Sequence, residues 1–300
     1  MQQETRVATF NVLNLAPPGV ALYENLAVCG PDEVEAKLAW LARQFDLLDA
    51  DVVAVQEVFS QALLDAVLAR TRGYRTALRL GQDPAPGAAR YTPNVALVTR
   101  LPLAGPVRML DFPPELGAGP DTPGFARAPL LATLQWADGT LVDVIVVHLK
   151  SRRPDYRVGE SMDDPVQFSL AHLRSLHWRA LEAAALRVHV SRLLGAGRPC
   201  IVLGDFNDAI GAVTTELVLG YGAEPATRLA DAAAIAHNRP SNAFTLLHEG
   251  VASTIDHILV SPQLAVSEVH YFNQHLREHE PGASDHGQVL AKLYRAPPPA

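Results

Sequence analysis

The chain has 300 residues, of which 48% are hydrophobic and 19% charged, and its 25 Lys and Arg against 32 Asp and Glu give a net charge of −7. This composition is that of a globular protein with a sizeable core, and no stretch approaches the ~20 uninterrupted apolar residues of a membrane span. The acidic balance excludes a broad basic surface for duplex DNA, so any nucleic acid has to be held by a local group of cations.

The first residues, MQQETRVATFNVL, enter an apolar strand pattern directly and show no basic segment followed by an apolar run. They therefore predict no secretory leader, although a mature form whose leader had been removed would read the same way. Two cysteines, Cys29 and Cys200, are too few for a disulfide framework. Together these features favour a cytoplasmic protein.

The first half of the chain alternates strand and helix patterns. Residues 6–13 are typical of a strand, and Asp32 with Glu35 has the spacing of a capping box at the start of a helix. Apolar residues then recur every three or four positions as far as Leu48, which is one face of that helix. Buried strands are predicted at 52–55 and 94–99, and Ser60 is expected to cap a short helix between them.

The second half begins with a segment, 111–124, that is too rich in Pro and Gly for regular structure. Two strand patterns, 130–136 and 141–148, flank Asp138-Gly139, a strong signal for a hairpin. A polar loop then leads to a long helix over about 165–194. Three further strands are predicted, at 200–203, 254–260 and 289–294.

No repeat or polar linker divides these elements. We therefore predict an α/β fold with mixed sheets and flanking helices, formed as one domain over residues 1–300. Two domains that meet near residues 120–125 are the alternative.

Polar residues gather where the predicted strands end. Each has an ordinary structural explanation when taken alone: Asp205 and Asn207 fit a turn, and a single glutamate such as Glu57 is usually solvated. If the chain stays extended, Asp205 and Asn207 lie on one side of it, as do His148 and Lys150. The remaining members of the group are Asn11, Asp256, Asp285 and His286.

Taken together, these residues form a set rich in oxygen donors and without cysteine. Carboxylate and amide oxygens suit a hard divalent cation, so the set predicts Mg²⁺ or Mn²⁺.

Six short motifs resemble those of the endonuclease/exonuclease/phosphatase superfamily of divalent-metal phosphoesterases, and they occur in that family's order. They span residue 10 to residue 286 and read FNVLN (10–14), QEV (56–58), VVHLKS (146–151), GDFND (204–208), TIDHILVS (254–261) and SDH (284–286). The resemblance implies a four-layer α/β sandwich in which two β-sheets pack face to face with helices outside.

The resemblance also implies roles for individual residues. Glu57 matches the metal-binding glutamate, Asn11 the asparagine beside it, and Asp285 a second acid near the metal. Asp205 matches the aspartate that positions or deprotonates the attacking water, and Asn207 the amide that holds water and phosphate. The matching catalytic histidine and the carboxylate that orients it are His286 and Asp256.

Other positions distinguish branches of the superfamily. His148 matches a histidine found in pancreatic-type deoxyribonucleases and sphingomyelinases, where repair-type apurinic endonucleases have a tyrosine. Those repair enzymes also carry an acid at the position of Leu13. Thr254-Ile255-Asp256-His257 differs from the sequence of inositol-phosphate 5-phosphatases. Both of these branches are therefore disfavoured.

The most favoured function is that of a nuclease that hydrolyses phosphodiesters of DNA or RNA. A phosphodiesterase or phosphatase for a small molecule or lipid headgroup is the alternative, and a non-enzymatic scaffold is disfavoured because the matched positions are intact. No obligate protein partner is evident. Lys150, Arg152 and Arg153 begin the loop after His148, where we expect them to bind substrate phosphate. The alternative is a solvated loop whose opposite charges pair.

Overall fold

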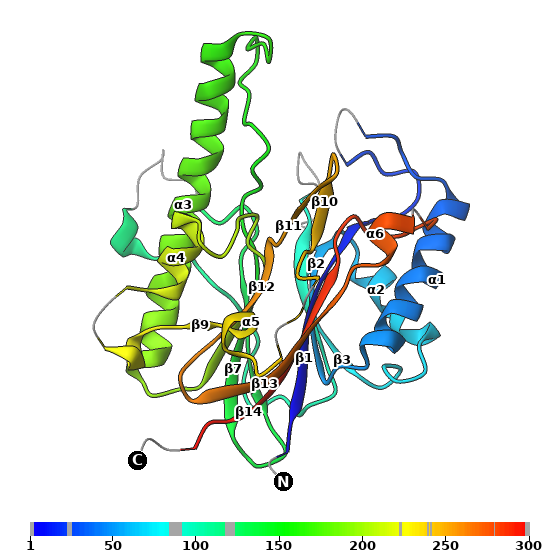
Figure 1. The fold of residues 1–300 in the computed structure, drawn as a ribbon. Coiled ribbons are helices and arrows are strands. Elements are labelled where there is room, and N and C mark those ends of the chain that lie inside the picture. Colours follow the sequence, from blue (N-terminus) through cyan, green and yellow to red (C-terminus); the bar gives the residue numbers. More distant parts are fainter. Residues whose placement is uncertain are drawn as a thin grey trace.

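The structure is a computed structural model that describes residues 3–22, 26–83, 92–117, 124–221, 224–238, 240, 242–278 and 280–297. Within them, two six-stranded sheets form the centre of the molecule (Figure 1). The first sheet has the order β13 (Leu264–Phe272), β14 (Gln288–Arg295), β1 (Thr5–Leu15), β2 (Val52–Val58), β4 (Asn94–Thr99), β3 (Leu78–Gly81). The second has the order β5 (Arg108–Met109), β6 (Leu130–Gln135), β7 (Leu141–His148), β8 (Cys200–Asp205), β12 (Asp256–Val260), β9 (Ala230–Asp231).

Helices flank the two sheets in the described ranges. They are α1 (Pro31–Leu48), α2 (Gln61–Arg70), α3 (Pro165–Gly195), α4 (Val213–Leu219), α5 (Ala232–Ile235) and α6 (His275–Glu278), with short 3₁₀ turns at Pro114–Leu116 and Pro225–Thr227. A small hairpin, β10 (Leu246–His248) with β11 (Val251–Ser253), stands apart from both sheets. No helix in the described ranges is long and apolar enough to cross a bilayer.

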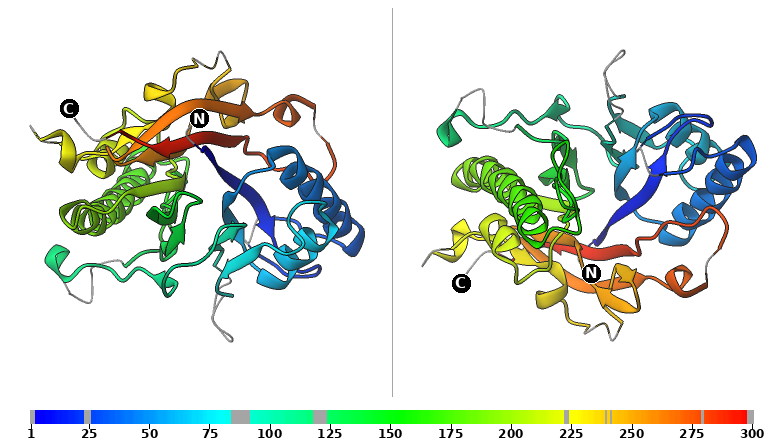
Figure 2. Two further views of the ribbon diagram at one scale, coloured as in Figure 1. Left: turned by 90° about the horizontal axis from the view of Figure 1, so that it is seen from below. Right: turned by 90° about the horizontal axis from the view of Figure 1, so that it is seen from above.

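Three apolar clusters hold these layers together. One lies between the sheets and joins side chains of both, such as Ala54 and Val146. A second packs α1 and α2 on the first sheet, and a third packs α3 and α4 on the second. The order of layers is helix, sheet, sheet, helix (Figure 2), which confirms the predicted four-layer sandwich.

Most predicted elements form where the pattern placed them. Ser60 caps α2 by accepting a hydrogen bond from the Leu63 N–H, and the hairpin of β6 and β7 turns at Asp138-Gly139. The predicted N-cap of the first helix, Asp32, is wrong by two residues, because the N-cap is Gly30. The helix begins at Pro31, and Glu33 accepts the hydrogen bond from the N–H of Gly30, because proline is suited to the first turn. The alternative domain junction near 120–125 falls largely outside the described residues.

The pairing of the strands brings the polar motifs to one end of the sandwich. β1 runs parallel to β2 and β7 runs parallel to β8, so each pair delivers its carboxyl ends to the same edge. In register, Asn11 lies beside Gln56, and Asp205 lies beside His148 and Asp256. The start of β1 and the end of β14 lie at the opposite end (Figure 1).

Gly204 controls how closely β7 and β8 approach just before Asp205. Its φ is +147°, and a Cβ at this position would lie 2.0 Å from the carbonyl oxygen of Val147. We expect Gly204→Ala to lower the free energy of unfolding by about 3 kcal/mol or more, since neither strand backbone has room to move. Gly211→Ala is the matched control, because its Cβ meets no atom within 4 Å. Equal urea midpoints for the two variants would contradict the steric argument.

Candidate active site

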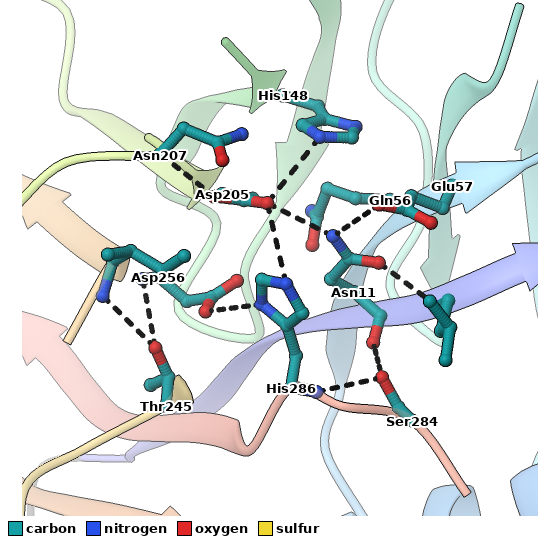
Figure 3. Close-up of polar contacts among 12 residues, drawn as sticks. Asn11, Gln56, Glu57, His148, Asp205, Asn207, Thr245, Asp256, Ser284 and His286 are labelled. Carbon is teal, nitrogen blue, oxygen red and sulfur yellow. Dashed lines mark hydrogen bonds and ion pairs between the residues drawn. The ribbon is translucent and has the colours of Figure 1, made fainter. Parts of the chain in front are cut away.

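The amide of Asn11, in the second half of β1, lies at the centre of the polar group (Figure 3). Its Nδ2 donates to Oε1 of Glu57 at 3.2 Å and to Oδ2 of Asp205 at 3.0 Å. Its Oδ1 accepts a hydrogen bond from the N–H of Leu13, which fixes the orientation of the amide. One side chain therefore connects carboxylates that stand on different sheets.

Glu57 occupies a strained position at the end of β2. Its φ is +64°, and Leu13 and Asn14 on the neighbouring strand also have positive φ. A side chain in this left-handed region costs about 1–3 kcal/mol, and such strain is concentrated at functional sites. Here it is accompanied by a hydrogen bond from the N–H of Asn14 to Oε2 of Glu57. The carboxylate is only partly buried, so it is open to a ligand.

Two histidines approach the same carboxylate oxygen of Asp205. Nε2 of His148 lies 3.5 Å from Oδ2, and Nε2 of His286 lies 3.9 Å from it. The other ring nitrogen of His286, Nδ1, is 2.9 Å from Oδ2 of Asp256. All four side chains are buried (Figure 3). Asp256 thus binds one ring nitrogen of His286, and Asp205 lies near the Nε2 atoms of both histidines. This arrangement is suited to proton transfer and charge stabilisation.

Asn207 forms a turn and does not continue the strand. Its φ is +54°, and its N–H donates to Oδ1 of Asp205 at 2.8 Å. The prediction of an extended chain at 205–207 is therefore wrong, because β8 ends at Asp205 and the carboxylate closes a turn on the following backbone. The side chain nevertheless stays at the site, where Nδ2 donates to the carbonyl of Leu149.

Burial and mutual charge set the protonation states of these groups. Burial, with the nearby Asp256 carboxylate, raises the pKa of Asp205 to about 7. Burial opposes protonation of His286, but Asp256 and Asp205 outweigh it and hold the pKa of His286 well above its ordinary value. Burial, then the charges of Arg127 and His286, lower the pKa of His148 well below its ordinary value. At neutral pH the site thus holds one charged and one neutral imidazole, and the contact of His148 with Asp205 is not an ion pair.

Two groups of residues have the ligand chemistry for a divalent cation. Asp205, Asp256 and His286 offer ligand atoms that all lie within 4.8 Å of one another. However, a protonated His286 that donates to Asp256 has no free nitrogen lone pair for a metal. Glu57 supplies hard oxygen donors beside Asp205, and the Asn11 amide joins the two carboxylates by donating to both, while its own oxygen accepts from the N–H of Leu13. These donors fit Mg²⁺ or Mn²⁺ better.

The other predicted site residues lie farther out. Asp285 is exposed, and its charge acts on His286 and on Lys37 of α1. Lys150 does not share a side with His148, since its Nζ points to Ser175 of α3 at 3.3 Å. That prediction is wrong because β7 ends at His148, after which the alternation of sides no longer applies.

The two predicted arginines differ in their contacts. Arg152 pairs with Asp208, and its Nε donates to the carbonyl of Asn207 at 3.2 Å. The backbone carbonyl of Arg153 accepts a hydrogen bond from Ser175. Within the loop, Glu160 accepts from the backbone N–H of Arg157, and it forms its ion pair with Arg174 of α3.

Three supporting residues were not identified from the sequence. Oγ of Ser284 donates to the carbonyl of Asn11 and accepts from the N–H of His286. Oγ1 of Thr245 accepts from the N–H groups of Ile255 and Asp256. The guanidinium of Arg127 donates to the carbonyls of His148 and Leu149. Ser284 lies within the SDH motif, whereas no local signal marks Thr245 or Arg127.

Comparisons with solved structures show the same fold in several proteins. An endonuclease/exonuclease/phosphatase from Bacteroides vulgatus has 18% identity and a TM-score of 0.66, over 98% of this chain and 100% of that one. A humanized D. rerio TDP2 has 16% identity and a TM-score of 0.64, over 97% and 98%. The human Nocturnin catalytic domain with bound sulfate has 18% identity and a TM-score of 0.60, over 99% and 96%.

A search of curated protein sequences finds no match. The model of one protein family, described as the Endonuclease/Exonuclease/phosphatase family, matches residues 8–286, which include every candidate catalytic residue named above. Members of this family are hydrolases of phosphoric ester bonds and generally depend on a divalent metal. The chain belongs to the endonuclease/exonuclease/phosphatase family.

Proposed function

We propose that this chain is a divalent-metal-dependent phosphodiesterase that hydrolyses nucleic acid. The observation that carries the proposal is the environment of Oδ2 of Asp205. This single oxygen accepts from Asn11 and lies within 4 Å of Nε2 of both His148 and His286. Hydrolysis of an anionic diester needs a carboxylate that orients water and cations that offset charge on the phosphate oxygens.

Each buried group has a distinct task in this proposal. Asp205 orients the attacking water and accepts its proton. The charged His286, held by Asp256, donates to a phosphate oxygen where negative charge develops. The neutral His148 donates from Nε2 to the phosphate. Asn207 holds the phosphate or the water with its amide.

Glu57 would hold the metal, Asn11 would keep the Glu57 carboxylate in place through the hydrogen bond from its Nδ2, and Asp285 would add a second acid at the rim. When bound, a divalent ion supplies Lewis-acid stabilisation of the phosphoryl oxygens.

The lipid-headgroup alternative is favoured by one feature of the surface. The loop over 151–164 and the first half of α3 project beyond the sheets at the active-site end (Figure 1). This projection carries exposed apolar side chains, including Val158, Met162, Val166 and Leu173. A headgroup phosphodiester at a lipid surface would meet such side chains. Net acidity of the whole chain is compatible with either substrate class.

A substitution of Glu57 tests the proposed metal ligand. Glu57→Gln keeps the shape of the side chain and removes one hard, charged ligand, so we expect it to lower Mn²⁺ affinity at least tenfold and to abolish most turnover. Isothermal titration with Mn²⁺ measures the affinity. Glu35→Gln is the matched control, because Glu35 pairs with Arg70 on the outer surface of α1 and α2. Unchanged Mn²⁺ binding by Glu57→Gln would exclude Glu57 as a ligand.

Substitutions of His286 and Asp205 separate an effect on catalysis from an effect on stability. His286→Ala and Asp205→Asn should each lower kcat by ~10²-fold or more on a labelled oligonucleotide with Mg²⁺. The pKa of Asp205 is raised from 3.8 to about 7, so its ionisation costs folding free energy as the pH rises through that interval. The Tm of metal-free Asp205→Asn at pH 8 should therefore not fall below that of the wild type.

The same assay is run on sphingomyelin vesicles and on bis-nitrophenyl phosphate, with Asp205→Asn as the inactive control. Cleavage of the oligonucleotide at a kcat/KM well above that of the vesicles supports a nuclease. The reverse order would establish the headgroup enzyme instead. A large fall in Tm with normal turnover would show that Asp205 has a structural role only.

A further inference from the structure

Two arginines share one buried carboxylate next to the candidate active site. Asp208, only 5% exposed, follows Asn207 in the turn after β8. Oδ1 accepts from Arg152 and from the N–H of Ala209, while Oδ2 accepts from Nε of Arg179 at 3.2 Å and from Oγ1 of Thr214 at 2.7 Å. The carboxylate is thus fixed from both sides, and the group of Arg152, Asp208 and Arg179 has a surplus of one positive charge.

The two arginines differ in their exposure. Arg179, on α3, is 5% exposed and also donates from Nη1 to the carbonyl of Lys150 at 3.3 Å. Its guanidinium therefore neutralises the Asp208 carboxylate from the interior of the protein. The side chain of Arg152 is 56% exposed, so the surplus charge of the group is presented to solvent at the rim of the site. In a chain with a net charge of −7, this is the kind of local cation that binding of a polyanion requires.

The guanidinium of Arg152 is held in a defined orientation beside the catalytic turn. Nη2 is bound to Asp208, and Nε donates to the carbonyl of Asn207. The N–H of Asn207 in turn donates to Asp205. Among the described residues, Nη1 of Arg152 has no hydrogen-bond acceptor. An arginine fixed at one edge and open at the other is preorganised to bind phosphate oxygens with little further loss of side-chain entropy.

We propose that Arg152 binds the backbone phosphate that flanks the scissile phosphate of a nucleic-acid strand, and that Asp208 is the positioning residue that holds Arg152 there. The inference rests on the proposed function, because a flanking phosphate exists only in a polymeric substrate. It also gives the loop over 151–164 a role at its first residues, which lie next to the turn formed by Asn207 and Asp208.

Binding is tested without turnover. Fluorescence anisotropy measures the Kd of a labelled single-stranded oligonucleotide for the full chain in EDTA at several salt concentrations. Arg152→Ala should raise Kd about tenfold and reduce the slope of log Kd against log salt by about 0.7, which is one phosphate contact on a single strand. Arg192→Ala is the matched control, since it removes an exposed arginine of α3 that pairs with Glu115 and lies away from the site. It should leave both quantities unchanged.

A double-mutant cycle tests the role of Asp208. Asp208→Asn should weaken oligonucleotide binding in the wild-type background but cost nothing further in Arg152→Ala, because the two residues act through one contact. If Asp208→Asn does not fold, Thr214→Val replaces it in the cycle, because this variant removes one hydrogen-bond donor to Asp208. It should weaken binding in the same Arg152-dependent way.

Several outcomes would overturn the proposal. An unchanged salt slope in Arg152→Ala would mean that the arginine touches no phosphate. Independent costs of Asp208→Asn and Arg152→Ala would remove the positioning role. Equal loss of kcat/KM on the oligonucleotide and on bis-nitrophenyl phosphate would assign Arg152 to the geometry of Asn207. A failure of the proposed function can be told apart from these outcomes. In that case the wild-type protein binds the oligonucleotide and Arg152→Ala reduces the salt slope as predicted, but the wild-type protein does not cleave the oligonucleotide.

Discussion

One amide group joins the two halves of the candidate active site. Asn11 stands on the first sheet, and its Nδ2 reaches Glu57 on the neighbouring strand and Asp205 on the second sheet. The residues that it connects are 46 and 194 positions away in the chain. Because the apolar cluster between the sheets sets their separation, the packing of the core determines whether this bridge forms. This bridge fixes the position of Glu57, the candidate metal ligand, relative to Asp205, the candidate base.

Burial then gives the two sides of the bridge different electrostatic properties. Asp205 and Asp256 are buried close together and share the charged His286. The protonated forms of Asp205 and His286 are therefore favoured on this side of the bridge. Glu57 is only partly buried and receives hydrogen bonds from Asn11 and Asn14. We therefore propose that a divalent cation binds there and not among groups that already hold an imidazolium. The same carboxylate turn, continued through Asp208, fixes an arginine at the rim.

Features that depend on strand patterns could be predicted from the sequence. His148 and Asp205 end their strands, Glu57 lies next to the end of β2 and Asn11 lies in the second half of β1. The parallel pairs bring these residues to one end of the sheets. The four layers were inferred from the family resemblance, and the structure confirms them.

Features that depend on tertiary contacts could not be predicted in this way. Lys150 was assigned to the side of His148, yet Glu182 of α3 accepts from its N–H and its side chain lies against Ser175. The partner of Arg152 is Asp208, 56 residues away, and Thr245 supports Asp256 across a hairpin. No spacing in the sequence encodes these contacts, because they arise where separate loops meet after folding. The prediction for the start of α1 was wrong for a local reason. Proline at the first position of the helix outweighed the capping pattern of Asp32.

The central claim is that the divalent ion binds on the Glu57 side of the Asn11 bridge. Anomalous diffraction from a crystal of the protein soaked in Mn²⁺ tests it most directly. The account predicts a manganese peak at coordination distance from a carboxylate oxygen of Glu57, about 2.0–2.3 Å, with Asp256 still bonded to Nδ1 of His286. A peak enclosed by Asp205, Asp256 and His286, with that histidine coordinating through nitrogen, would contradict it.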